Sequence, residues 1–153
     1  MPQTSKVQTD NEIVTRMIEL AAKKYNCSQL MLILAMEQEG RENPGLVRAM
    51  SGLANGCGFF HETCGIMTGA ASLISWYAGK GQDNEEESEH LLPMLQDLGE
   101  WFRKEIGDKH NGTKCMEIVG DMVGTPEGKQ ICGGIILRTY QKTMEILRSH
   151  DVA

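Results

Sequence analysis

Long apolar runs are missing from this chain of 153 residues. The longest uninterrupted run, at residues 30–36, is far shorter than the roughly 20 residues that a helix needs to cross a bilayer. The opening residues, MPQTSKVQTD, also lack the apolar core of a secretory signal. These absences predict a cytoplasmic protein that is not inserted into a membrane.

Aromatic residues make up only 5% of the chain, and no segment alternates apolar and polar side chains as a half-buried strand does. Methionine, by contrast, occurs ten times, and its flexible side chain suits adaptable packing between helices. The formal net charge of −6 does not favour a nucleic-acid or anionic-membrane partner. The composition therefore predicts an all-α protein that binds no nucleic acid.

Apolar residues at helical spacing recur along the chain and predict a single-domain bundle of five to seven helices over residues 11–150. Residues 1–10 are polar, and we expect a disordered tail there. Pro93 should lie in the first turn of a helix or at a kink. The expected helices cover residues 11–25, 26–39, 45–54, 65–78, 88–106, 114–119 and 129–149.

Several residues mark the ends of these helices. Asp10 or Asn11 is expected to cap the first helix. Thr113 is expected to cap the short helix over residues 114–119. Asn26, with Gln29 three residues later, forms a capping box. Asn43 precedes a proline, as a cap does when proline opens a helix. The TPEG sequence at residues 125–128 predicts a turn before the last helix.

The five cysteines lack the familiar spacings. No Cys-x-x-Cys pair occurs, which excludes the signals for thioredoxin-type chemistry and for c-type haem attachment. The intervals between the cysteines also match no zinc-finger or ferredoxin pattern. In a reducing cytoplasm we expect thiols, metal ligands or redox groups rather than permanent disulfides.

Four cysteines share a placement in the first two turns of an expected helix. We call them the cysteine quartet: Cys27, Cys64, Cys115 and Cys132. The partial positive charge of a helix N-terminus lowers the pKa of a thiol and favours the thiolate. Thiolates attack disulfides and bind soft metals such as iron and zinc. The same pattern also fits buried, inert thiols, because cysteine is among the most buried residue types.

A glycine-rich stretch over residues 52–71 holds the remaining candidates. Cys57 and His61 lie there beside Cys64, and both are candidate additional metal ligands. Gly65 and Gly69 should allow close approach of a neighbouring helix or of a bound cofactor, where a Cβ would clash. A pair of His61 and Cys64 would suit an enzyme, but no Asp or Asn that would orient the histidine is evident. Whether the protein is an enzyme therefore stays open.

With these residues the chain resembles the redox-active proteins named C_GCAxxG_C_C after their cysteine pattern. Their hallmark is four cysteines and a C-G-A-x-x-G motif, and the CGIMTG sequence at residues 64–69 is similar to it, with Ile66 in place of alanine. The NCSQ sequence around Cys27 is similar to the family's first cysteine segment. Cys115 and Cys132 would be the third and fourth cysteines. The resemblance implies a small helical redox protein, with an iron–sulfur cluster as one cofactor that it could hold.

The cysteine quartet supports a redox role of two kinds. One is thiol/disulfide exchange with a redox partner protein, and the other is electron transfer through an iron–sulfur or other metal centre. The alternatives are a structural zinc-binding module and a purely helical interaction module with inert cysteines, and a homodimer is left open. If the quartet acts as one site, at least three of its four sulfurs should line one pocket beside residues 56–69.

Overall fold

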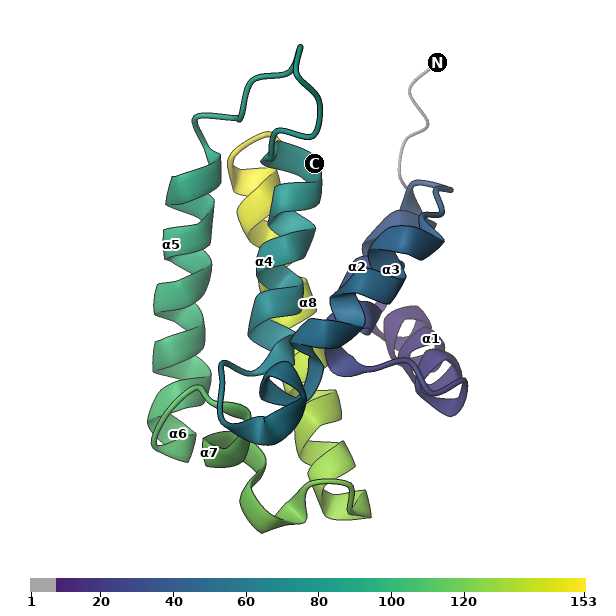
Figure 1. The fold of residues 1–153 in the computed structure, drawn as a ribbon, viewed down its shortest axis with the longest axis vertical. Helices are drawn as coiled ribbons and strands as arrows, with labels where there is room; N and C mark the ends of the chain where they lie inside the picture. Colours follow the sequence, from purple (N-terminus) through teal and green to yellow (C-terminus); the bar gives the residue numbers. More distant parts are fainter. Residues whose placement is uncertain (1–7) are drawn as a thin grey trace.

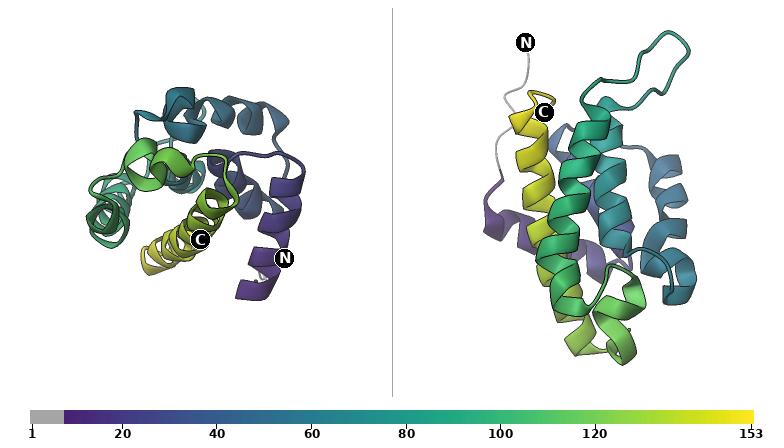
Figure 2. Two further views of the ribbon diagram at one scale, coloured as in Figure 1. Left: turned by 90° about the horizontal axis from the view of Figure 1, so that it is seen from below. Right: turned by 90° about the vertical axis from the view of Figure 1, so that its left-hand side faces the viewer.

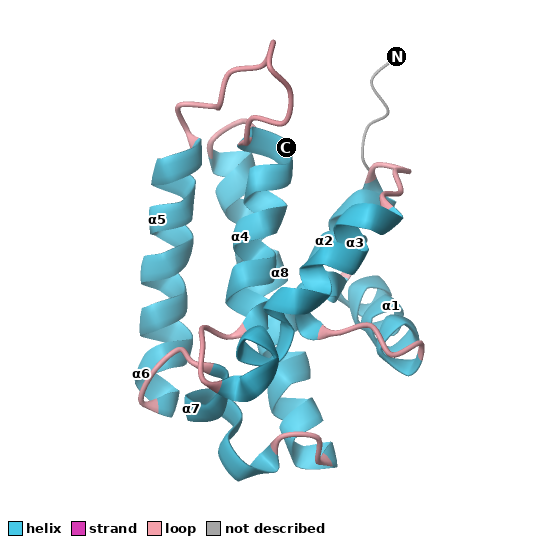
Figure 3. Cartoon of the chain, viewed as in Figure 1, coloured by secondary structure: helices cyan, strands magenta, loops and turns pink. Residues whose placement is uncertain are grey.

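The computed structural model describes residues 8–153, and all regular secondary structure within them is helical (Figure 3). Apart from the three-residue α6, these residues form seven α-helices, which confirms the predicted all-α bundle (Figure 1). The α-helices are α1 (Asp10–Ala22), α2 (Cys27–Gln38), α3 (Pro44–Met50), α4 (Gly65–Ala78), α5 (Leu91–Phe102), α6 (Asp108–His110), α7 (Cys115–Val119) and α8 (Pro126–Ser149).

Several helix starts follow the sequence signals. The backbone N–H of Asn26 donates to Gln29 Oε1 at 2.9 Å, which is one arm of the predicted capping box. Asn43 Oδ1 accepts the N–H of Leu46 at 3.0 Å, and Pro44 is the first residue of α3. Pro93 lies in the first turn of α5, as predicted. Local capping chemistry therefore sets where these helices begin.

Two helices begin earlier than the sequence pattern predicted. Thr9, and not Asp10 or Asn11, caps α1: its hydroxyl accepts the N–H of Glu12 at 3.2 Å. Residues 125–128 are not a turn before the last helix, because Thr125 Oγ1 accepts the N–H of Gly128 at 3.1 Å and caps α8. In both places a threonine hydroxyl satisfies an N–H that the first helical turn leaves unpaired.

Other boundaries also differ from the prediction. The cap position of α7 is Lys114 rather than Thr113. The expected helix over residues 45–54 ends at Met50 and continues as a 3₁₀ turn, Ser51–Leu53. Most of the expected N-terminal tail lies outside the described residues, and in its described part the side chain of Gln8 accepts a hydrogen bond from Gln38 Nε2 at 3.0 Å.

Helix α4 lies at the centre of the bundle, packed against α2, α5 and α8 (Figure 1). Residues 28–36 of α2 are all buried, which explains why this helix carries the longest apolar run in the sequence. Leu73 and Ile74 of α4, with Leu98 of α5, are fully enclosed in the main core. None of the helices in residues 8–153 combines the length and apolarity needed to cross a bilayer.

The two ends of the bundle differ in character. The starts of α4 and α8 lie at the same end as α7, whereas the loop between α4 and α5 projects from the opposite end (Figures 1 and 2). That loop carries the largely acidic sequence DNEEESE at residues 83–89. All seven residues are exposed except Ser88, which is half-buried. The helix starts that carry cysteines are therefore separated from the acidic loop by the length of α4.

Candidate functional site

Three quartet cysteines occupy the starts of helices. Cys27 and Cys115 are the first residues of α2 and α7, and Cys64 is the N-cap residue of α4. Cys132 lies in the second turn of α8, because that helix begins at Pro126. Four separate helices thus supply the quartet, as the sequence predicted.

A short β-bridge fixes Cys64 next to the start of α7. Thr63 and Lys114 form an isolated antiparallel bridge. The N–H of Cys64 donates to the Thr113 carbonyl at 2.8 Å, and the N–H of Cys115 donates to the Glu62 carbonyl at 3.0 Å. These bonds satisfy two amides that helix starts leave without intrahelical partners. They also hold two quartet cysteines at fixed positions relative to each other.

The loop before Cys64 forms a left-handed turn. Asn55, Gly56, Cys57 and Gly58 have φ values of 53°, 57°, 59° and 84° in succession. Gly56 is buried here: a Cβ on it would lie 2.8 Å from the Glu62 carbonyl oxygen and 3.0 Å from the Cβ of Cys115. Its positive φ and its close packing both require glycine.

Gly65 and Gly69 lie where α4 meets α2. A Cβ on Gly65 would lie 2.6 Å from Cys27 Sγ, so this sulfur rests directly against the start of α4. A Cβ on Gly69 would lie 2.9 Å from both the Cα and the carbonyl oxygen of Ser28. The expected close approach of a neighbouring helix is therefore present at both glycines, whereas their use in binding a cofactor stays a prediction.

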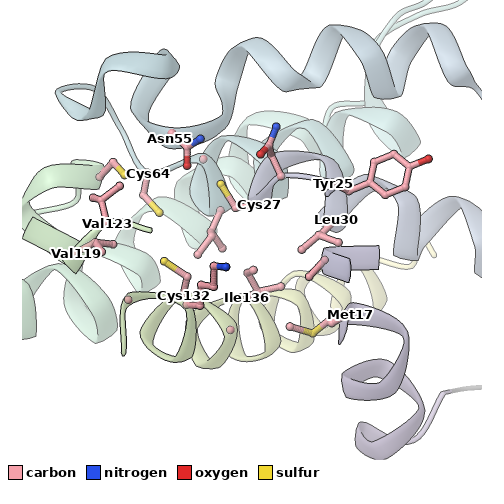
Figure 4. A pocket seen from close by; sticks show the side chains of 18 of the residues that line it. Met17, Tyr25, Cys27, Leu30, Asn55, Cys64, Val119, Val123, Cys132 and Ile136 are labelled. Carbon is pink, nitrogen blue, oxygen red and sulfur yellow. The ribbon is translucent and has the colours of Figure 1, made fainter. Parts of the chain in front are cut away.

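All four quartet cysteines line one cavity of about 610 Å³, which we call the quartet pocket. Figure 4 shows the side chains of Cys27, Cys64 and Cys132 directed toward a common space from three different segments. Cys64 and Cys115 are buried, and Cys27 and Cys132 are partly buried. All of them are free thiols. The pocket meets the expectation that at least three quartet residues converge, while their chemical role stays a prediction.

Cys57 and His61 lie outside the group that lines the quartet pocket. Both side chains are exposed, and the ring of His61 lies against that of Phe59 with centroids 5.6 Å apart. The left-handed turn points Cys57 to solvent although its neighbour Gly56 is buried. This arrangement gives no support to either residue as an additional ligand.

Burial, and not the helix N-termini, dominates the ionisation of the quartet. Desolvation raises the pKa of Cys64 to about 12 and that of Cys132 to about 11. The pKa values of Cys27 and Cys115 are raised for the same reason. The expected low thiol pKa is therefore wrong for this structure: the four thiols are neutral at pH 7, because burial penalises the thiolate more than nearby amides stabilise it.

Nearby backbone amides nonetheless favour negative charge on two of the sulfurs. The backbone amides of Asn55 and Ser28 lower the pKa of Cys27, in opposition to the larger effect of burial. Those of Ile66 and Met67 act in the same way on Cys64. A negatively charged sulfur at these positions would find amide donors in place already.

Sequence reasoning missed several other residues of the quartet pocket. Met17, Ile18 and Tyr25 from the first helix and the turn after it line the pocket, together with Lys24 and Asn55. Figure 4 shows Met17 and Tyr25 at the end away from Cys64. Their sequence positions carry no motif, and only tertiary packing brings α1 to the pocket that the cysteines line.

Comparison with known protein families supplies one match. The sequence model of the family described as "Putative redox-active protein (C_GCAxxG_C_C)" matches residues 25–146, which is well over half of the chain. The chain belongs to this family. No match was found among curated proteins or among solved structures.

The C_GCAxxG_C_C family match spans all four quartet cysteines and the CGIMTG sequence. Ile66, which stands where the motif has alanine, is buried and lines the quartet pocket beside Cys64. The motif position thus contributes a larger apolar side chain than alanine to the pocket lining. Membership supports a redox role in general and leaves its chemistry to be argued from the pocket.

A single metal ion does not fit the described arrangement. Within residues 8–153, no three or more His, Cys, Asp or Glu side chains are grouped as a metal ion would require. A single zinc ion needs each of its sulfurs at about 2.3 Å. The thiol donor set is of the kind that soft metals prefer, and whether it holds a metal centre stays a prediction.

Proposed function

We propose that this protein is a redox protein in which the cysteine quartet holds an iron–sulfur cluster and acts in electron transfer. One observation carries the proposal: four cysteines from four separate helices line a single pocket. Inert cysteines would have no reason to meet, because each could fill a gap in its own part of the core. A shared function accounts for their convergence.

The ionisation of the thiols supports a metal centre over free thiolates. Burial keeps the four thiols neutral at pH 7, and a neutral thiol is a poor nucleophile. A cation in the pocket would compensate the charge of the thiolates and release their protons. The amides near Cys27 and Cys64 would then stabilise the negative sulfurs.

In this proposal each part of the chain has a separate task. The four quartet side chains would be the ligands, and such a cluster supplies one-electron transfer. Gly65 leaves room for Cys27 Sγ at the start of α4, where a side chain would displace it. The bridge between Thr63 and Lys114 keeps the segments of two ligands together. The burial of Cys64 and Cys115 would limit the access of water to their two sulfurs.

Reversible dithiol/disulfide chemistry is the second candidate, and the position of Cys27 favours it. Its sulfur lies against Gly65, the residue that follows Cys64, and negative charge on Cys27 would raise the pKa of the Cys64 thiol. In this reaction the two thiols form one S–S bond and give up two protons and two electrons. A disulfide in a redox partner protein accepts them and becomes two thiols.

One preparation separates these candidates. Protein purified without oxygen should contain iron and acid-labile sulfide and absorb visible light, if the quartet holds a cluster. Each single Cys→Ala change within the quartet should abolish this signal, whereas the matched control Cys57→Ala should keep it, since Cys57 is exposed outside the pocket. Normal metal content in the quartet variants would contradict the proposal.

The other outcomes are equally specific. Metal-free protein whose quartet forms a reversible disulfide would support the dithiol candidate. Zinc without iron, together with unfolding by a chelator, would indicate a structural zinc module. A variant without the quartet that keeps its stability and its protein partner would indicate a helical interaction module. We further propose that the protein is cytoplasmic, which cell fractionation would test. We also propose that it acts with a redox partner protein, which cross-linking would test. Sedimentation would show whether the chain forms a homodimer.

A further inference from the structure

The quartet pocket extends well beyond the cysteines. Met17 and Tyr25 line its other end, and Leu30 and Ile136 lie between them and the thiols (Figure 4). Its volume of about 610 Å³ lies within the roughly 300–1,000 Å³ of typical small-molecule sites. A disulfide or a metal centre at the cysteine end accounts for only one part of this space. The apolar end is therefore available to a second molecule.

Exposed apolar side chains stand at this end of the pocket. Ile18 and Tyr25 line the pocket, although Ile18 is 65% exposed and Tyr25 is 39% exposed. Single exposed apolar residues are common on protein surfaces. These two, however, continue an apolar wall that already lines a cavity, so that an apolar molecule seated there would cover them. The burial of that surface would favour binding.

The charge of the pocket lining is of one sign. Among the described residues that line the pocket, the only charged side chains are Lys24 and Lys129. The chain as a whole carries a net charge of −6, so a lining without any acidic group differs from the rest of the molecule. Within residues 8–153 neither lysine forms an ion pair with a carboxylate. An anionic group on a ligand would find a positive potential there.

We propose that the apolar end of the quartet pocket binds a small organic anion, with its apolar body against Met17, Ile18 and Leu30 and its anionic group near Lys24 or Lys129. The binding depends only on the shape and charge of the pocket.

Two dyes test this proposal in the full-length protein. The probe is 8-anilinonaphthalene-1-sulfonate, an apolar aromatic anion, and the uncharged dye Nile red is its neutral counterpart. Fluorescence titration should give one saturable sulfonate site per chain. Circular dichroism and urea unfolding should first show that each variant is folded, because partly folded states also bind such dyes.

Matched substitutions locate the site. Ile18→Gln should weaken sulfonate binding roughly five-fold through lost apolar contact. Leu92→Gln is its control, because Leu92 is 64% exposed, nearly the same as Ile18, but lies on α5 outside the pocket. It should leave the affinity unchanged. Equal effects of the two changes would overturn the proposed site.

Charge is tested in the same way. The double change Lys24→Gln with Lys129→Gln should weaken sulfonate binding roughly three- to ten-fold and leave Nile red binding unchanged. Changing Lys80 and Lys109, two exposed lysines outside the pocket, to glutamine is the control. No saturable binding, or an equal loss of binding for both dyes, would overturn the proposal.

The iron and thiol assays on the same preparations keep the two proposals separate. Binding at the pocket by protein with inert cysteines would uphold this inference and end the redox proposal. If the quartet is redox-active but the protein does not bind the sulfonate, the redox proposal stands and the proposed anion site is wrong.

Discussion

Adding one methyl group at Gly69 should separate the two helices that carry Cys27 and Cys64. In Gly69→Ala the new Cβ would meet the Cα and the carbonyl oxygen of Ser28 at 2.9 Å, and the Cγ of Met31 at 3.1 Å. Ordinary carbon contacts lie at about 3.5 Å or more, so α2 and α4 would have to move apart by roughly 0.5 Å. The obstacle is backbone, and a rotamer change cannot remove it.

The energetic effect combines two opposing terms. Overpacking of a close contact destabilises by about 1–3 kcal/mol. Replacing glycine by alanine inside a helix stabilises by about 0.5–1 kcal/mol. We therefore expect Gly69→Ala to lower the free energy of unfolding by about 1–2 kcal/mol, and Gly69→Val to lower it further.

Gly134→Ala is the matched control. Gly134 also lies inside a helix, α8, but a Cβ there meets nothing within 4 Å. This change should stabilise the protein by about 0.5–1 kcal/mol through helix propensity alone. Urea unfolding followed by circular dichroism measures both variants. If Gly69→Ala is as stabilising as Gly134→Ala, the close crossing of α2 and α4 does not constrain the fold and the argument is wrong.

Raising the pH should destabilise the protein through Cys64, whose pKa is raised by burial from 9.0 to about 12. This thiol is neutral in both states below about pH 8, and above pH 9 it ionises first in the unfolded chain. The free energy of unfolding should therefore fall between pH 9 and 12, and less steeply in Cys64→Ala; equal slopes would contradict the assigned burial. Ser28→Ala should cost about 1–3 kcal/mol, because the Ser28 hydroxyl is buried and donates to the Met50 carbonyl at 2.7 Å. A near-zero change on urea unfolding would mean that another donor replaces it. His61→Ala should leave iron content unchanged and stability within about 0.5 kcal/mol, since His61 is exposed outside the pocket; loss of iron would restore it as a ligand.

The helices were predictable because their signals are local. Apolar spacing identified each long helix, and the short polar signals at Asn26 and Asn43 marked two of the starts. The two misplaced starts had local signals as well. Thr9 and Glu12 form a capping box by sequence, and Thr125 precedes a proline that can open a helix. Those errors came from assigning these residues to a tail and a turn.

The left-handed turn and the pocket lining could not be predicted in the same way. Glycines at 56 and 58 indicate positive φ, but Asn55 and Cys57 adopt it too, and nothing local shows which way Cys57 then points. Met17 and Ile18 line the same pocket as the cysteines only because α1 packs near α2 and α8. Contacts between distant segments depend on the assembled core, and periodicity within one helix does not encode them.

The cysteines show why position on a helix is insufficient to predict reactivity. A helix N-terminus contributes about 0.3–1 kcal/mol to the stability of a nearby negative charge, which corresponds to less than one pKa unit. Burial acts in the opposite direction and can shift a pKa by 3–5 units. Cys64 occupies an N-cap position and is only 5% exposed, so burial dominates and its pKa rises. Burial in the apolar pocket keeps this thiol neutral, whereas the backbone amides of Ile66 and Met67 favour the thiolate and would help to hold it once a metal supplied the opposing charge. The same environment thus opposes free thiolate chemistry and favours ligation, which is why the proposed cluster takes precedence over disulfide exchange.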